Sequence, residues 1–166
     1  LSGNFGAELQ NIDVSAPAFS GEELKALLHV LYENRLVVLR NQKLSESDFI
    51  AFGKRVGTPI PHVLEHLRLP GYPEIFPITN ITKDGRTPKH GAAHWHTDQS
   101  YEPEPSSVTM LYSLQAPEKG GETRLCDLMS AYEALPKSIQ DKIDKLKVEH
   151  LYGTGIAVRD GDLPPS

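Results

Sequence analysis

The sequence predicts an α+β fold, mainly β, with helices in two groups. Three observations support this class: two capped helical segments near the start, a second helical pair around residues 128–146, and strand-like segments joined by short turns between and after them. This order of elements favours an α+β or β-rich architecture over a doubly wound parallel sheet. Because 166 residues with 39% hydrophobic content can bury one core, we expect a single domain over residues 1–166.

The first helix is predicted by a capping box. Ser20 and Glu23 have the spacing of that motif, and leucines follow at helical intervals, so residues from about Gly21 to Asn34 should be helical. The run Leu36–Leu39 is short and apolar, which is typical of a strand buried on both faces inside a sheet. A strand-helix alternation therefore opens the chain.

A second helix should begin after Ser45, which can cap it, and end at Gly57 with a left-handed C-cap. Six of the thirteen prolines then lie between Pro59 and Pro88, which indicates a loop-rich region with one edge strand at best. Beyond it we expect a turn at Gly120-Gly121 and two helices broken by Pro136, over Leu128–Leu135 and Ile139–Leu146. Three further strands are predicted at Val108–Leu114, Glu122–Cys126 and Val148–Tyr152.

Composition excludes several function classes. The formal net charge of -5, from 22 acidic and 17 basic residues, gives no electrostatic footprint for nucleic acid. No apolar run approaches the roughly 20 residues that a membrane span needs. With Cys126 as the only cysteine, no intrachain disulfide can form, which fits a reducing compartment. We therefore expect a cytoplasmic protein with no membrane partner.

The segment Trp95-His96-Thr97-Asp98 carries the clearest chemistry. In extended structure, side chains at positions i and i+2 share a face, so His96 and Asp98 could both bind one metal ion. One imidazole and one carboxylate suit Fe(II), and a second histidine from elsewhere would complete a two-His, one-carboxylate facial triad. The bare tripeptide is a weak signal, so its surroundings decide how it is interpreted.

Those surroundings resemble the TauD/TfdA family of Fe(II)- and 2-oxoglutarate-dependent dioxygenases over essentially the whole chain. The motifs fall in family order and are densest from Trp95 to Pro136. They are Gly6-Ala7-Glu8-Leu9, Ile12-Asp13-Val14, Leu36-Val37-Val38-Leu39-Arg40, Phe52-Gly53-Lys54-Arg55-Val56-Gly57, Trp95-His96-Thr97-Asp98, Pro105, Leu111-Tyr112, Gly120-Gly121-Glu122-Thr123 and Ala131-Tyr132-Glu133-Ala134-Leu135-Pro136.

The resemblance implies a double-stranded β-helix, the clavaminate synthase-like jelly roll, with flanking helices. It also implies Fe(II) as cofactor, 2-oxoglutarate and O2 as co-substrates, and hydroxylation of a small organic, anionic substrate with release of succinate and CO2. By position, His96 and Asp98 match the first two iron ligands, Thr123 matches a threonine that holds the distal carboxylate of 2-oxoglutarate, and His62 matches a substrate-pocket histidine.

Two family elements have no counterpart here, namely the third ligand, a histidine, and the arginine that pairs with 2-oxoglutarate. After Asp98 the only histidine is His150, which matches a family position outside the metal site. Half a jelly roll would leave strand edges unpaired, so we expect that the chain is the N-terminal part of a longer protein. Assembly into a homo-oligomer is left as an open alternative. His90 and His94 precede the motif. His94 is a candidate hydrogen-bond partner of a metal ligand, although a solvated loop is favoured.

The substrate is not readable from the sequence. Glu65 matches a tyrosine of the taurine pocket, and its carboxylate would repel a sulfonate, which disfavours taurine. Two other functions remain open. One is an inactive binding or interaction module with an incomplete metal site. The other is a zinc hydrolase on a cupin-like barrel, which lacks an evident general base beside the metal pair.

Overall fold

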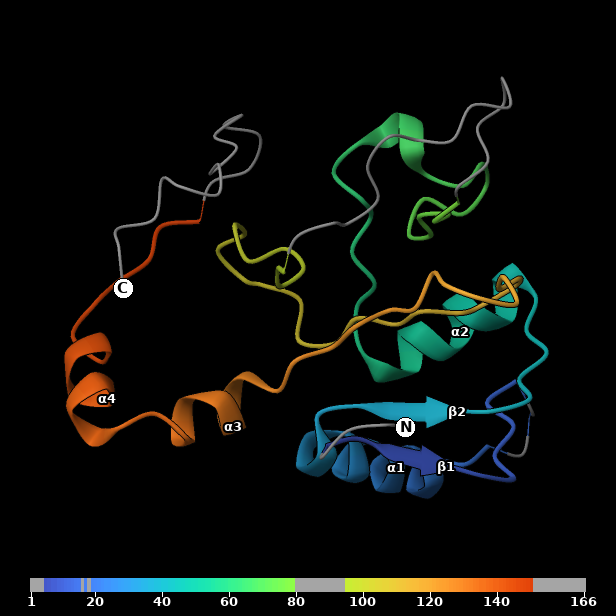
Figure 1. Cartoon of the computed structure of the whole chain (residues 1–166). Helices are drawn as coiled ribbons and strands as arrows, with labels where there is room; N and C mark the ends of the chain where they lie inside the picture. The colour runs from blue at the N-terminus through green and yellow to red at the C-terminus, as the bar shows by residue number, and fades with distance from the viewer. Residues whose placement is uncertain (1–4, 16, 18, 80–94, 151–166) are drawn as a thin grey trace. The chain divides into compact units, whose positions relative to one another are not determined.

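The computed structural model describes residues 5–15, 17, 19–79 and 95–150 (Figure 1). Its contacts divide the chain into two compact units. The first comprises Leu1–Ala93 and Met110–Ala134, and the second His94–Thr109 and Leu135–Ser166. No helix among the described residues is long and apolar enough to cross a membrane.

The first unit is built on a parallel β-α-β arrangement (Figure 1). Strand β1 (Ala7–Leu9) pairs with β2 (Val37–Leu39) in the register Ala7↔Val37, and helix α1 (Gly21–Asn34) connects the two. Parallel strands need such a crossover because a tight hairpin cannot join them. The predicted strand at Leu36–Leu39 is confirmed, but it is half-buried and has one neighbour in a two-stranded sheet of the described residues, so the prediction of a strand buried on both faces was wrong.

Helix α1 begins at the predicted capping box. The Ser20 hydroxyl accepts from the Glu23 N–H at 3.1 Å, and the Glu23 carboxylate accepts from the Ser20 N–H at 2.6 Å. These bonds satisfy two backbone donors that the helix itself cannot pair. At the other end Arg35 adopts a left-handed conformation (φ 65°), and its N–H bonds the Leu31 carbonyl. The predicted helix bounds are therefore confirmed.

Helix α2 (Glu46–Val56) has the same kind of start, a capping box between Ser45 and Asp48. It ends at the predicted C-cap residue, but the conformation of that residue differs from the prediction. Gly57 is extended, with φ −178°, and closes the helix by donating to the Gly53 carbonyl. The prediction of a left-handed C-cap was therefore wrong. Because any residue can adopt an extended φ, this position does not require glycine. A short 3₁₀ helix, η1 (Glu65–Leu67), follows in the proline-rich region.

The core of the first unit is small and aromatic. Its buried side chains are Val14, Phe19, Leu27 and Phe52, which come from α1, α2 and the segment before α1. The Phe19 and Phe52 rings meet edge to face with centroids 6.0 Å apart, and the Arg55 guanidinium lies 4.8 Å from the Phe19 centroid. Met110 packs against the same cluster, so the segment after residue 109 is tied to these helices.

The three strands predicted beyond residue 100 are absent from the described residues. Val108–Leu114 and Glu122–Cys126 are irregular, as is the described part of Val148–Tyr152, which ends at His150. A strand needs a hydrogen-bonded neighbour, and alternating side chains do not provide one. The two helices are confirmed with different bounds. Helix α3 (Leu128–Glu133) in the first unit ends two residues early, and α4 (Lys137–Ile143) in the second begins two residues before and ends three residues before the predicted bounds.

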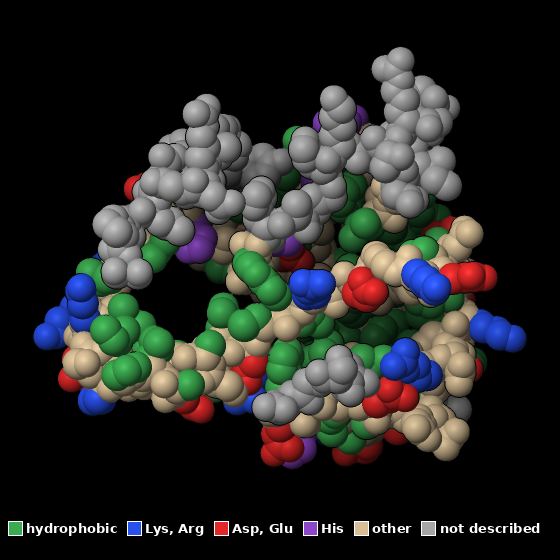
Figure 2. Space-filling model, in the orientation of Figure 1, with side chains coloured by type: hydrophobic (Ala, Val, Ile, Leu, Met, Phe, Trp, Pro, Cys, Tyr) green, Lys and Arg blue, Asp and Glu red, His purple; other side chains and the backbone are tan. Residues whose placement is uncertain are grey.

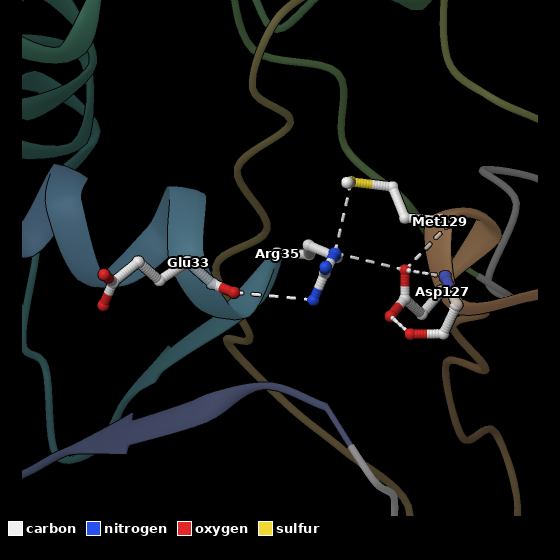
Figure 3. A network of polar contacts seen from close by, with 5 residues as sticks. Glu33, Arg35, Asp127 and Met129 are labelled. Atoms are coloured by element: carbon white, nitrogen blue, oxygen red, sulfur yellow. Dashed lines mark hydrogen bonds and ion pairs between the residues drawn. The ribbon is translucent and has the colours of Figure 1, made fainter. Parts of the chain in front are cut away.

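A polar network in the first unit joins the end of α1 to the start of α3 (Figure 3). Asp127 caps α3 by accepting from the N–H groups of Met129 and Ser130, and its side chain is only 7% exposed. The Arg35 Nε lies 3.3 Å from the Asp127 Oδ1 and 3.4 Å from the Met129 Sδ. Because the hydroxyl of Ser130 donates to the same carboxylate, the pKa of Asp127 is lowered, and the charge of Arg35 adds to the effect.

Several large apolar side chains lie at the surface. On α4 and just after it, Ile139, Ile143 and Leu146 are 42%, 37% and 62% exposed, and Figure 2 shows hydrophobic side chains gathered over this helix. Leu111 and Leu114, at 62% and 84%, lie in the irregular segment that was predicted to be a strand. Exposed apolar groups of this number are typical of surfaces that another element covers.

We predict that Phe52→Ala lowers the free energy of unfolding by about 3 kcal/mol, because removing a buried ring loses its transfer energy and leaves a cavity. Chemical denaturation measures this. Tyr32→Ala is the matched control, since Tyr32 lies on α1 and is 66% exposed, and it should change stability by less than about 0.5 kcal/mol. Equal effects of the two substitutions would contradict the core described above.

We predict that the Asp127 network makes stability depend on acid pH. Since the folded-state pKa of Asp127 is lowered, its contribution is present above the unfolded value of about 3.9 and is lost as pH falls through the folded pKa. Melting temperatures between pH 6 and pH 2 should therefore fall less steeply for Asp127→Asn than for the unchanged protein. Ser130→Ala, which removes the donor, should flatten the curve in the same direction, and parallel curves would contradict the assignment.

Candidate metal centre

His96 and Asp98 lie side by side in the second unit. The His96 Nε2 is 3.2 Å from the Asp98 Oδ1, and the two side chains are 51% and 47% exposed. Two ligand atoms bound about 90° apart at about 2.1 Å from an octahedral metal ion lie about 3.0 Å from each other. The observed spacing therefore suits two neighbouring positions on one ion, and an imidazole nitrogen with a carboxylate oxygen suits Fe(II).

The prediction that these residues lie on a strand was wrong. Residues 95–97 are irregular, and a turn begins at Asp98. Gln99 adopts a left-handed conformation (φ 53°), and its carbonyl accepts from the Glu102 N–H at 3.0 Å. The pair therefore meets at the start of a turn, at residues that form no strand. A left-handed non-glycine residue is uncommon and costs energy, and such residues cluster at functional sites.

The second oxygen of Asp98 is also bonded. The Thr109 hydroxyl donates to the Asp98 Oδ2 at 2.9 Å, across eleven residues of sequence. The Ser106 hydroxyl contacts the Gln99 side-chain oxygen within the same loop. Thr109 was not among the site residues predicted from the sequence, although it lies within the predicted strand Val108–Leu114.

No third ligand joins the pair within the described part of the chain, where no group of three His, Cys, Asp or Glu side chains could hold a metal ion. His150 instead has its Nδ1 2.9 Å from the Ser100 hydroxyl oxygen. The position of His150 outside the metal site stays a prediction. His90 and His94, of which His94 was considered above as a partner of the metal ligands, lie outside the described residues. The described donors thus fit two of the three protein positions of a facial triad.

His62 lies in the first unit and is held in a defined orientation. Its Nδ1 accepts from the Leu64 N–H at 3.2 Å, and its ring stacks on Phe76 with centroids 4.4 Å apart and an interplanar angle of 22°. The Arg68 Nε donates to the His62 carbonyl at 2.7 Å. Because Nδ1 is an acceptor, the neutral ring carries its proton on Nε2, which leaves that nitrogen a donor.

Thr123 is exposed in an irregular stretch that follows the predicted double-glycine turn. Gly120 and Gly121 both have positive φ, 78° and 75°. A Cβ at Gly121 would lie 3.1 Å from the Pro117 ring, so both backbone conformation and space favour glycine there. The turn is therefore confirmed, whereas the role of Thr123 in binding 2-oxoglutarate stays a prediction.

A family model described as "Taurine catabolism dioxygenase TauD, TfdA family" matches residues 1–164. The chain belongs to this family. The resemblance found in the motifs is thus confirmed, and dioxygenases of the family use Fe(II) and 2-oxoglutarate. The double-stranded β-helix that the family implies is not visible in the described residues, which contain two parallel strands and four α-helices.

Three relatives illustrate the range of the family. The alpha-ketoglutarate-dependent 2,4-dichlorophenoxyacetate dioxygenase of Cupriavidus pinatubonensis is 28% identical over 158 residues, which cover 88% of this chain and 55% of that protein. Pentalenolactone F synthase of Streptomyces arenae is 33% identical over 124 residues, 72% of this chain and 42% of that protein.

The third, the alpha-ketoglutarate-dependent sulfate ester dioxygenase of Pseudomonas putida, is 25% identical over 167 residues, 100% of this chain and 53% of that protein. The chain therefore spans about half the length of the curated relatives it matches.

Proposed function

We propose that the protein is an Fe(II)- and 2-oxoglutarate-dependent dioxygenase that hydroxylates a small organic anion and releases succinate and CO2. The observation that carries this proposal is the 3.2 Å approach of the His96 Nε2 and the Asp98 Oδ1 in a chain of the TauD/TfdA family. We further propose that residues 1–166 belong to one dioxygenase domain with the jelly-roll fold of that family.

In this proposal His96 and Asp98 hold the iron at two adjacent positions. Bound iron and 2-oxoglutarate supply the oxidising chemistry, and the protein contributes ligation, orientation and exclusion of water. Thr123 would donate its hydroxyl to the distal carboxylate of 2-oxoglutarate. Its exposed position after two left-handed glycines leaves room for a ligand to approach the backbone closely.

His62 would bind the substrate anion. Its neutral tautomer presents an Nε2–H donor, and stacking on Phe76 fixes the ring plane, so the donor points in one direction before the substrate arrives. The Phe76 ring also adds apolar surface beside this donor. We therefore propose as substrate an organic acid whose anionic group is attached to an apolar body. The relative named for 2,4-dichlorophenoxyacetate acts on a molecule of this class.

Taurine itself remains disfavoured for this chain. Glu65, at the position of a taurine-pocket tyrosine, pairs with the Arg68 guanidinium at 3.3 Å, which offsets part of its charge. The Glu65 side chain is nevertheless 85% exposed, and the attraction of such a surface pair is weak. A carboxylate that is only partly neutralised still opposes a small sulfonate more than a larger, mainly apolar acid.

A binding module that has lost catalysis is the second candidate. It is favoured by one observation, that no third ligand joins His96 and Asp98 among the described residues. Such a module would bind iron weakly or not at all and would form no succinate. The two candidates differ in this measurable property.

We predict that His96→Ala and Asp98→Ala each reduce succinate formation from 2-oxoglutarate at least about a thousandfold, because each removes a metal ligand. Succinate released per enzyme under aerobic turnover with Fe(II) measures the effect. His150→Ala is the matched control, since this histidine contacts Ser100 and should leave most of the rate intact. Turnover that survives both ligand substitutions would refute the proposed function.

We predict that His62→Leu raises the KM for the organic acid substrate about tenfold to a hundredfold, because a hydrogen bond to a charged group is lost. The affinity for Fe(II) should not change. His66→Leu provides the control, since His66 is exposed in η1 four residues away. A KM that responds equally to both substitutions would show that His62 does not bind the anion.

A further inference from the structure

The bond between Thr109 and Asp98 distinguishes the two oxygens of the candidate metal ligand. Oδ1 lies 3.2 Å from the His96 Nε2, whereas Oδ2 accepts the Thr109 hydroxyl at 2.9 Å. A carboxylate that binds a metal through one oxygen has a second oxygen that needs a donor, and protein donors of this kind orient the ligand. The two contacts thus assign different tasks to Oδ1 and Oδ2.

The Thr109 side chain is suited to this task. Its branched Cβ restricts χ1, so the hydroxyl has few alternative positions. The loop between the two partners is closed by local contacts, because the Gln99 carbonyl accepts from the Glu102 N–H and the Gln99 side chain contacts Ser106. The terminal torsion of an aspartate is broad, so without a donor its carboxylate rotates readily.

We propose that Thr109 is a positioning residue that holds the Asp98 carboxylate for one-oxygen binding of the metal through Oδ1. This inference rests on the proposed function and adds a residue to it. Thr109 touches neither metal nor substrate in this account and acts through Asp98. Its loss should therefore weaken metal binding without unfolding the protein, since its side chain is exposed.

The test compares Thr109→Val, which keeps the shape and removes the hydroxyl, with Thr109→Ser, which keeps the hydroxyl. Thr97→Val makes the same chemical change between the two ligands and serves as the matched control. Anaerobic Mn(II) titration of the metal-free protein, followed by the electron paramagnetic resonance signal of free Mn(II), gives the Kd of each variant. Thermal melting without metal shows that each is folded, and Thr109→Ala replaces the valine variant if that one unfolds.

The Kd of Thr109→Val should rise about tenfold to a hundredfold, while Thr109→Ser and Thr97→Val stay near the unchanged protein. Two results would overturn the inference alone: a valine variant that binds Mn(II) as tightly as the unchanged protein, or a serine variant as weak as the valine variant. An unchanged protein that binds no Mn(II), or binds it equally well after His96→Ala, would overturn the proposed function as well.

Discussion

The packing of Phe19 against Phe52 is the contact on which the first unit depends. These rings join the segment before α1 to α2, and Leu27 of α1 and Val14 complete the buried cluster. With only four buried side chains among the described residues, each contributes a large share of the stabilising burial. The parallel strands β1 and β2 are joined over only three residue pairs. So short a pair is not stable without the helices that pack on it.

Sequence reasoning succeeded where the determinants were local. The capping boxes at Ser20 and Ser45 and the double glycine at Gly120-Gly121 each need only a few neighbouring residues, and all three are present. It failed for Val108–Leu114. Apolar side chains alternate along this segment, but a strand also needs a hydrogen-bonded partner, which no local pattern supplies. The alternation is still visible in the burial, since Val108, Met110 and Tyr112 are half-buried whereas Thr109 and Leu111 are exposed.

The predictions for the candidate site divide in the same way, into local features that are present and partners distant in sequence that were not predicted. The i, i+2 spacing predicted that His96 and Asp98 meet, and they do, although these residues form no strand. The donor to Asp98 lies eleven residues away, and the orientation of His62 depends on Phe76, fourteen residues away. Neither partner could be predicted from spacing alone, because loop closure decides which side chains come together. Family membership supports the chemistry proposed for the site, and the contacts show how Asp98 and His62 are oriented in this chain.

A crystal structure of the protein grown with Mn(II) and 2-oxoglutarate in the absence of oxygen would test the central claim most directly. Anomalous scattering from manganese locates the ion without assumptions about its ligands. The account predicts one ion within about 2.3 Å of both the His96 Nε2 and the Asp98 Oδ1, with the Asp98 Oδ2 still bonded to the Thr109 hydroxyl. An ion bound elsewhere, or bound at this place through neither side chain, would contradict it.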